Sequence, residues 1–484
     1  MSDPDIPFLR RLRTDLDRAA RSTSQRSRFG GRPASAIAAI IVAVAIIGSS
    51  ILLWRALGSA RPDRGSAAPT LHTSSPAPNA SPSSTAPSGA NASPTPGATG
   101  SSGPISHGPP PPPLGDTLRS VVAIAANDVW AVGVRFPRAP AYQPQSLVEH
   151  WDGASWTTRS VPEMGQLTSV AASGPDDVWV LGETPTLLHF DGSSWSKVPT
   201  AEVAGPQLRG LVAFAPNDAW VVGTERTDRY AGECGEHGRG TRPLVEHWDG
   251  STWREVASPS PRVHESELWS VSGSGSTDVW AVGYSSTDIP ATNPGNGCTR
   301  RSHARTLAMH WDGSSWAITQ TPNPGREDDV LAGITSLGPN DAWTTGWWIP
   351  GEGPGWPLFL HWDGQAWTVD PSLEHTSSQQ DRQPWAADAL ASDDIWTAGS
   401  YPNAPSLQHW DGSEWAIYED EAIGVDPRLK AGELTGISAI SPSDIWAVGW
   451  AAGYGSGKQL DEALILHWDG SRWARVAGAP FPHG

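Results

Sequence analysis

Two short motifs recur seven times over residues 116–484, and this repetition constrains the fold more than any other feature of the chain. The first motif is Asp-X-Trp followed by Gly three residues later, and its tryptophans are Trp130, Trp179, Trp220, Trp280, Trp343, Trp396 and Trp446. The second motif is His-Trp-Asp-Gly-X-X-Trp, with copies that begin at His150, His189, His247, His310, His361, His409 and His467. Phe190 replaces the first tryptophan of the second copy. Most of the 27 tryptophans belong to these motifs, so tryptophan recurs at fixed positions of a repeated unit.

Each repeat predicts four β-strands. The first is an apolar run such as 118–124, the second contains Val-Trp-Ala-Val-Gly or a variant of it, the third ends in His-Trp, and the fourth begins near the last Trp. Asp-Gly predicts a tight turn between the third and fourth strands. Seven such units predict a seven-bladed β-propeller, an all-β fold of four-stranded antiparallel blades. Because the chain enters at a first strand and leaves after a fourth, we expect no blade to combine N- and C-terminal strands.

The repeated unit, Leu-X-X-Val…Asp-Val-Trp-Ala-Val-Gly…His-Trp-Asp-Gly-X-X-Trp-X-X-Val, resembles the repeats of bacterial kelch-like and galactose-oxidase-like propellers. Its Val-Trp-Ala-Val run is also similar to tectonin propellers, and Asp-Gly-X-X-Trp is similar to the Asp-box turn of sialidase-like propellers. The resemblance covers roughly residues 116–480. The Gly-Gly doublets of kelch repeats and the residue between Asp and Gly of the Asp-box are missing. The resemblance therefore implies the propeller fold and no catalytic residue.

The motif histidines and aspartates are predicted to be structural. A ring has one central axis, so a residue present in all seven copies belongs to the scaffold. We expect the aspartate of Asp-Gly to accept turn N–H groups and the histidine to pack or hydrogen-bond between strands.

Three segments of different composition precede the repeats. Residues 1–32 hold eight Arg and four Asp and predict a basic cytoplasmic segment with a short amphipathic helix. This helix lies on an anionic membrane surface or docks a cytoplasmic partner through residues 5–20. Residues 33–55 predict a transmembrane helix, because their uncharged run is long enough to span ~30 Å of hydrocarbon. Residues 56–115 predict a disordered linker rich in Pro, Ser, Thr and Ala, with possible O-glycosylation sites.

The distribution of arginine predicts the orientation in the membrane. Eight Arg precede the span, and only Arg55, Arg61 and Arg64 follow it closely. The positive-inside rule then places the N-terminus in the cytoplasm and the propeller outside, as a single-pass protein of the cell membrane. The alternative is a signal peptide that is cleaved near residues 58–60.

The net charge argues against nucleic acid as a partner. The chain carries a formal charge of −18 although its N-terminal segment is basic, so residues 116–484 are more acidic still. No nucleophile elbow, zinc-protease motif or phosphate-binding loop appears, and the sequence predicts no cofactor.

Candidate binding residues lie where the repeats differ. The separation between the motif Gly and the motif His ranges from 7 to 27 residues, and antiparallel connectivity sends all these connections to one face, here named the loop face. Its spare aromatic residues are Trp347, Trp348, Trp356, Tyr401, Trp450 and Tyr454. They predict an arc on three adjacent blades that stacks on sugar rings or anchors a protein, unless they pack the loops against one another.

A second variable position is the second residue of each first strand. Its occupants are Arg119, Thr168, Arg209, Trp269, Ala332, Trp385 and Thr435. First strands line a propeller's channel, so the two Arg and two Trp are predicted to converge on an acidic or planar ligand at the loop-face opening. The alternative is that they are scattered surface side chains.

Cys234 and Cys298 lie in the two longest loops, on adjacent blades. Outside the membrane this arrangement predicts a disulfide. A zinc site with His237 and His303 is the alternative.

These features together predict a membrane-anchored extracytoplasmic recognition module that binds a cell-envelope glycan or protein at the loop face. A signalling variant relays occupancy through the span to the cytoplasmic helix. Two alternatives stay open. One is a glycoside hydrolase or lyase, which requires two loop-face carboxyls about 5–10 Å apart. The other is a purely structural protein of the cell envelope.

Overall fold

The computed structural model describes residues 115–136, 143–183, 186–203, 205–227, 240–261, 263, 265–289, 301–351, 355–370, 380–402, 404–425, 429–455 and 458–479. The predicted cytoplasmic segment, membrane span and linker, with Cys234 and Cys298, lie outside these residues, apart from the last residue of the linker. Within the described part of the chain, no helix is long and apolar enough to cross a membrane.

Seven four-stranded antiparallel sheets form seven blades, each built from four consecutive strands. Blade one contains β1 (Thr117–Ala125), β2 (Asp128–Arg135), β3 (Gln145–Trp151) and β4 (Trp156–Thr158). Blade two contains β5 (Leu167–Gly174), β6 (Asp177–Gly182), β7 (Thr186–Phe190) and β8 (Trp195–Pro199). Blade three contains β9 (Gln207–Ala215), β10 (Asp218–Thr227), β11 (Gly240–Trp248) and β12 (Trp253–Glu255). Blade four contains β13 (Glu265–Gly275), β14 (Asp278–Ile289), β15 (Arg301–Trp311) and β16 (Trp316–Thr319).

The last three blades follow the same order. Blade five contains β17 (Asp329–Gly338), β18 (Asp341–Trp348), β19 (Trp356–Trp362) and β20 (Trp367–Val369). Blade six contains β21 (Gln383–Ala391), β22 (Asp394–Tyr401), β23 (Ala404–Trp410) and β24 (Trp415–Glu419), and a short 3₁₀ helix, η1 (Asp420–Ile423), follows it. Blade seven contains β25 (Leu429–Ser441), β26 (Asp444–Gly455), β27 (Lys458–Trp468) and β28 (Trp473–Arg475). The prediction of a seven-bladed propeller is confirmed.

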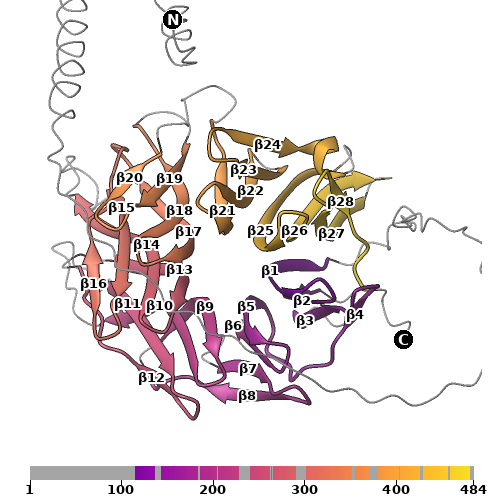
Figure 1. The fold of residues 1–484 in the computed structure, drawn as a ribbon, viewed down its shortest axis with the longest axis horizontal. Helices are drawn as coiled ribbons and strands as arrows, with labels where there is room; N and C mark the ends of the chain where they lie inside the picture. Colours follow the sequence, from indigo (N-terminus) through magenta and orange to yellow (C-terminus); the bar gives the residue numbers. More distant parts are fainter. Residues whose placement is uncertain are drawn as a thin grey trace, which may run out of the picture. The chain divides into compact units, whose positions relative to one another are not determined.

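The first strand of every blade lies innermost and contacts the first strands of both neighbours, so that β25 meets β1 and closes the ring (Figure 1). Among the described strands, each blade consists of four consecutive ones and none combines strands from the two ends, as expected. Side-chain packing and hydrogen bonds close the ring: Leu118 of blade one shares a core cluster with Trp446 and Ile465 of blade seven, and the Ala123 N–H donates to the Ser438 hydroxyl.

The segment after β28 reinforces this closure. Val476 and Ala479 are buried in the cluster between blades seven and one. The backbone N–H of Ala479 donates to the Glu149 carboxylate of blade one at 3.3 Å, and Glu149 is itself buried. The segment that follows β28 therefore packs against blade one and adds to the contacts between blades seven and one.

The motif histidine, aspartate and tryptophan form one contact in each blade. The histidine Nε2 lies 2.7 to 2.9 Å from the Oδ1 of the Asp-X-Trp aspartate in all seven blades. Its ring packs on the motif tryptophan at centroid distances of 4.0 to 4.4 Å. The aspartate of Asp-Gly accepts turn N–H groups, as at Asp152. The structural interpretation of both motifs is confirmed.

Candidate functional site

A β-bulge recurs in the first strand of every blade, near the loop face. In blade one the pairing of β1 with β2 shifts between Leu118 and Ser120, so Arg119 is the extra residue. The corresponding extra residues of the other blades are Thr168, Arg209, Trp269, Ala332, Trp385 and Thr435. A bulge redirects its extra side chain out of the regular alternation of the strand. All seven extra residues line a single cavity.

The motif glycine makes this bulge possible. A Cβ added to Gly133 would lie 1.9 Å from the Thr117 carbonyl oxygen, and the corresponding glycine of blade seven, Gly449, meets the Glu433 carbonyl oxygen at the same distance. Only a residue without a side chain allows the first strand to approach so closely. The glycine of the first motif thus determines where the variable side chains point.

The cavity is the loop-face opening of the central channel, here named the mouth, and its volume is about 700 Å³. Blades four to six supply Trp269, Ala332 and Trp385. The other blades supply a largely polar lining: Arg119, Gln166, Thr168, Glu183, Gln207, Leu208, Arg209, Glu433 and Thr435. The mouth therefore has an aromatic wall on one side and a polar wall on the other.

Three indoles from three consecutive blades meet at the aromatic wall. Trp347 of β18 packs edge-on against Trp385 at a centroid distance of 4.8 Å and contacts Trp269 at 5.8 Å. Trp269 and Trp385 are close to parallel, with centroids 6.4 Å apart and an interplanar angle of 30°. Blade five has Ala332 at its bulge, and this small residue leaves room for Trp347 to enter from the second strand.

Two arginines flank this wall, each held by a glutamate that also binds an indole. The Arg119 guanidinium and the Trp450 indole N–H both donate to Oε1 of Glu433, at 3.3 and 3.0 Å.

The second set has the same chemistry. The Arg209 guanidinium and the Trp269 indole N–H both donate to Oε2 of Glu267, at 3.3 and 3.0 Å. The guanidinium also lies 5.5 Å from the Trp269 ring centroid. Each glutamate therefore orients a cation and a tryptophan together.

Tyr284 lies behind Trp269, with ring centroids 5.6 Å apart. Burial raises the pKa of its hydroxyl, and the Glu267 and Glu265 carboxylates raise it further. The phenol stays protonated and supports Glu267 by a hydrogen bond.

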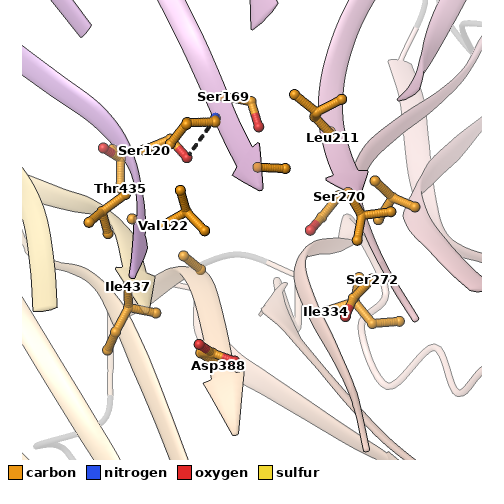
Figure 2. Close-up of a pocket in the computed structure, with 18 of the residues that line it drawn as sticks. Ser120, Val122, Ser169, Leu211, Ser270, Ser272, Ile334, Asp388, Thr435 and Ile437 are labelled. Atoms are coloured by element: carbon orange, nitrogen blue, oxygen red, sulfur yellow. Dashed lines mark hydrogen bonds between the residues drawn. The ribbon is translucent and has the colours of Figure 1, made fainter. Parts of the chain in front are cut away.

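The channel continues from the mouth into a space of about 360 Å³, which shares the seven bulge residues and is otherwise lined mainly by Ser, Ala, Val, Leu and Ile side chains (Figure 2). Asp388 of β21 faces this space from blade six (Figure 2). Its carboxylate accepts the N–H groups of Ala439 at 2.8 Å and Ala389 at 2.9 Å. Burial raises the pKa of Asp388 to about 6.

Hydrogen bonds between neighbouring blades use four backbone N–H groups of the innermost strands. Serine hydroxyls accept the N–H groups of Ala123, Val170 and Ser336 from a neighbouring blade, at 3.1 to 3.2 Å. Asp388 does the same for Ala439.

The predicted loop-face aromatics fall at several positions. Trp347 packs against Trp385 of the aromatic wall, and the Trp450 indole N–H donates to Glu433, which lines the mouth. Trp348 packs against the core cluster of blades four and five and pairs with Trp356 across β18 and β19. The guanidinium of buried Arg382 lies 4.0 Å from the Tyr401 ring centroid.

The side chain of Tyr454 is not among those that the structure describes, and Cys234, Cys298 and His237 lie outside the described residues. His303, the remaining residue of the zinc alternative, lies 3.2 Å from the Glu327 carboxylate. The predicted disulfide and its alternative both remain predictions.

Sequence reasoning singled out the bulge residues but missed Glu267 and Glu433. Both glutamates directly precede the leucine that stands before the bulge residue of their strand, Leu268 and Leu434. An acidic residue at this same offset in two repeats, each in a blade adjacent to one with arginine at the bulge, was the available signal.

No protein-family model matches the chain. No curated protein matches it either. Among solved structures, YCF48 bound to D1 peptide is 17% identical, with coverage of 77% of this chain and 97% of YCF48 and a TM-score of 0.44.

Two further solved structures are similar. The β-propeller domain of the Trilobed protease from Pyrococcus furiosus, described as having an open velcro topology, is 11% identical, with 75% and 96% coverage and a TM-score of 0.44. An ancestral GH74 enzyme is 16% identical, with coverage of 76% of this chain and 49% of the enzyme and a TM-score of 0.43. The likeness concerns the propeller architecture alone.

Proposed function

We propose that this protein is a membrane-anchored extracytoplasmic recognition module whose ligand, a glycan or a protein segment, binds at the mouth. The observation that carries the proposal is the convergence of seven variable bulge residues on one cavity of about 700 Å³. The scaffold residues repeat from blade to blade, whereas these seven differ in size, charge and aromatic character. Variable side chains gathered at one concave site of a regular ring are typical of a binding surface.

The arrangement favours binding over acid–base chemistry. The Glu267 and Glu433 carboxylates each already accept from an arginine and an indole. Such groups orient neighbouring side chains and keep them rigid before a ligand arrives, which lowers the entropic cost of binding.

The cellular part of the proposal rests on the sequence. The uncharged run within residues 33–55 supports a membrane anchor, and the eight Arg before it support a cytoplasmic N-terminus. The propeller then faces the cell envelope, where its ligand is found.

The test screens the full chain against a glycan array and a random peptide library. Ligands of the wild type are retested on a triple variant, Arg119→Ala with Trp269→Ala and Trp385→Ala. Arg472→Ala, on the opposite face and 71% exposed, is the control. We expect binding to be lost in the triple variant and retained in the control. Binding that survives the triple variant, or the absence of any ligand in both screens, contradicts the proposal.

A further inference from the structure

We infer that the ligand of the mouth is a neutral saccharide, an inference that rests on the proposed function and specifies its chemistry. The formal charge of the residues that line the mouth limits which ligands can bind there. The lining contains two arginines and two glutamates, Glu183 and Glu433, so its formal charge is zero, and Glu267 beside Arg209 adds one negative charge. An anionic ligand would meet these glutamates and an acidic domain, and a cationic ligand would meet two arginines. The lining therefore fits an uncharged ligand best.

Two tryptophans of the aromatic wall offer their rings to the ligand. Trp269 and Trp385 line the mouth with ring planes 30° apart, and Trp347 packs against both of them. An indole face carries partial negative charge and attracts positively polarised C–H groups. A pyranose ring has one face of axial C–H groups, so it matches such a wall in both shape and polarity.

The polar wall of the mouth offers both hydrogen-bond donors and hydrogen-bond acceptors. Gln166 and Gln207 can each donate and accept hydrogen bonds, and the Thr168 hydroxyl, which donates to the Leu181 carbonyl, can still accept one. The Arg119 and Arg209 side chains are 32% and 45% exposed, and each guanidinium has more N–H groups than its glutamate binds. A sugar hydroxyl both donates and accepts, so this mixed lining suits a row of hydroxyl groups.

An extended peptide, the other ligand of the proposed function, fits the inner strands less well. A peptide that adds as a β-strand needs free N–H and C=O groups along a sheet edge. Four N–H groups of the inner strands, those of Ala123, Val170, Ser336 and Ala439, are already bonded to side chains of the adjacent blade. The inner edge of the ring is thus partly closed to strand addition.

The test measures binding of neutral trisaccharides of glucose, mannose, galactose and N-acetylglucosamine to the full chain. Titration calorimetry is performed in a detergent without a sugar headgroup, with trigalacturonate as an anionic comparator. We expect at least one neutral trisaccharide to bind, with an affinity that stays constant between about 50 and 500 mM salt, because no charge pair forms with the ligand. Trigalacturonate is expected to bind more weakly.

Variants locate the site. Trp385→Ala should weaken trisaccharide binding roughly tenfold, since it removes the stacking surface, and Trp385→Phe should retain most of the affinity. Trp348→Ala makes the same chemical change at a strand position that packs against the core cluster, and it should leave affinity unchanged. Gln207→Ala alters an exposed polar side chain of the lining and should cost about fivefold. If near-ultraviolet circular dichroism shows that Trp385→Ala does not fold, the affinity of Gln207→Ala tests whether the saccharide binds at the mouth.

The outcomes separate the two proposals. Tighter, salt-sensitive binding of trigalacturonate overturns the neutral-saccharide inference. The same holds if no trisaccharide binds while the peptide library yields a ligand that depends on Trp385, and the proposed function then stands. If neither class binds at the mouth, both proposals are wrong.

Discussion

Glu149 makes the stability of the ring closure depend on pH in an unusual direction. Burial raises the pKa of this carboxyl to about 7, although the Ala479 N–H lowers it in part. A carboxyl whose pKa is higher in the folded state than in the unfolded state binds its proton preferentially when folded. The stabilisation that comes from protonated Glu149 is therefore complete below pH 4.5, the pKa of the carboxyl in the unfolded chain. It is lost as the pH rises through 7, the pKa in the folded protein.

The magnitude follows from the shift. A difference of about 2.5 pKa units, at 1.36 kcal/mol per unit, destabilises the folded state by about 3 kcal/mol at pH 8. Glu149→Gln keeps an amide oxygen that accepts the Ala479 N–H but carries no charge at any pH. We therefore expect this variant to be more stable than the wild type by up to about 3 kcal/mol at pH 8 and nearly equal to it at pH 4.

The assay is urea denaturation of the two proteins at pH 4, 6 and 8, followed by circular dichroism. Asp191→Asn is the matched control. Hydrogen bonds from the hydroxyl and N–H of Ser193 and the N–H of Ser194 hold the pKa of Asp191 down at about 2. Its effect on stability should therefore stay constant from pH 4 to pH 8. A Glu149→Gln effect that is equally constant, or that lowers stability at pH 8, refutes burial as the dominant influence on Glu149.

Three other predictions test the scaffold. Gly449→Ala places a Cβ 1.9 Å from a backbone oxygen, so it should lower the free energy of unfolding by more than about 2 kcal/mol, and urea denaturation that shows a smaller change contradicts the close approach. Deletion of residues 476–484 removes buried Val476 and Ala479 and should cost about 2–3 kcal/mol, whereas an unchanged denaturation midpoint would mean that the segment contributes nothing to closure. Mass spectrometry of the intact, non-reduced chain should show the loss of two hydrogens for a bond between Cys234 and Cys298, and a full complement of hydrogens contradicts the disulfide.

Much of the scaffold was predictable because it is local and repeated. The residues that determine the Asp-Gly turn, the histidine–tryptophan packing and the strand order all lie within one repeat. The same residues recur in every repeat, so each copy supports the same prediction. The position of the bulge residues was predictable for the same reason, since Arg119 and Trp385 occupy one register position in a repeated unit.

The contacts that build the mouth depend on which blades are neighbours and on how closely they approach. Trp347 reaches Trp269 and Trp385 only because Ala332 leaves space between them, and these residues come from three repeats. Glu433 meets Arg119 only because the ring closes and brings blade seven beside blade one. Local patterns of sequence determine secondary structure and blade topology, whereas a contact between distant side chains depends on closure geometry and on the volume of every residue between them.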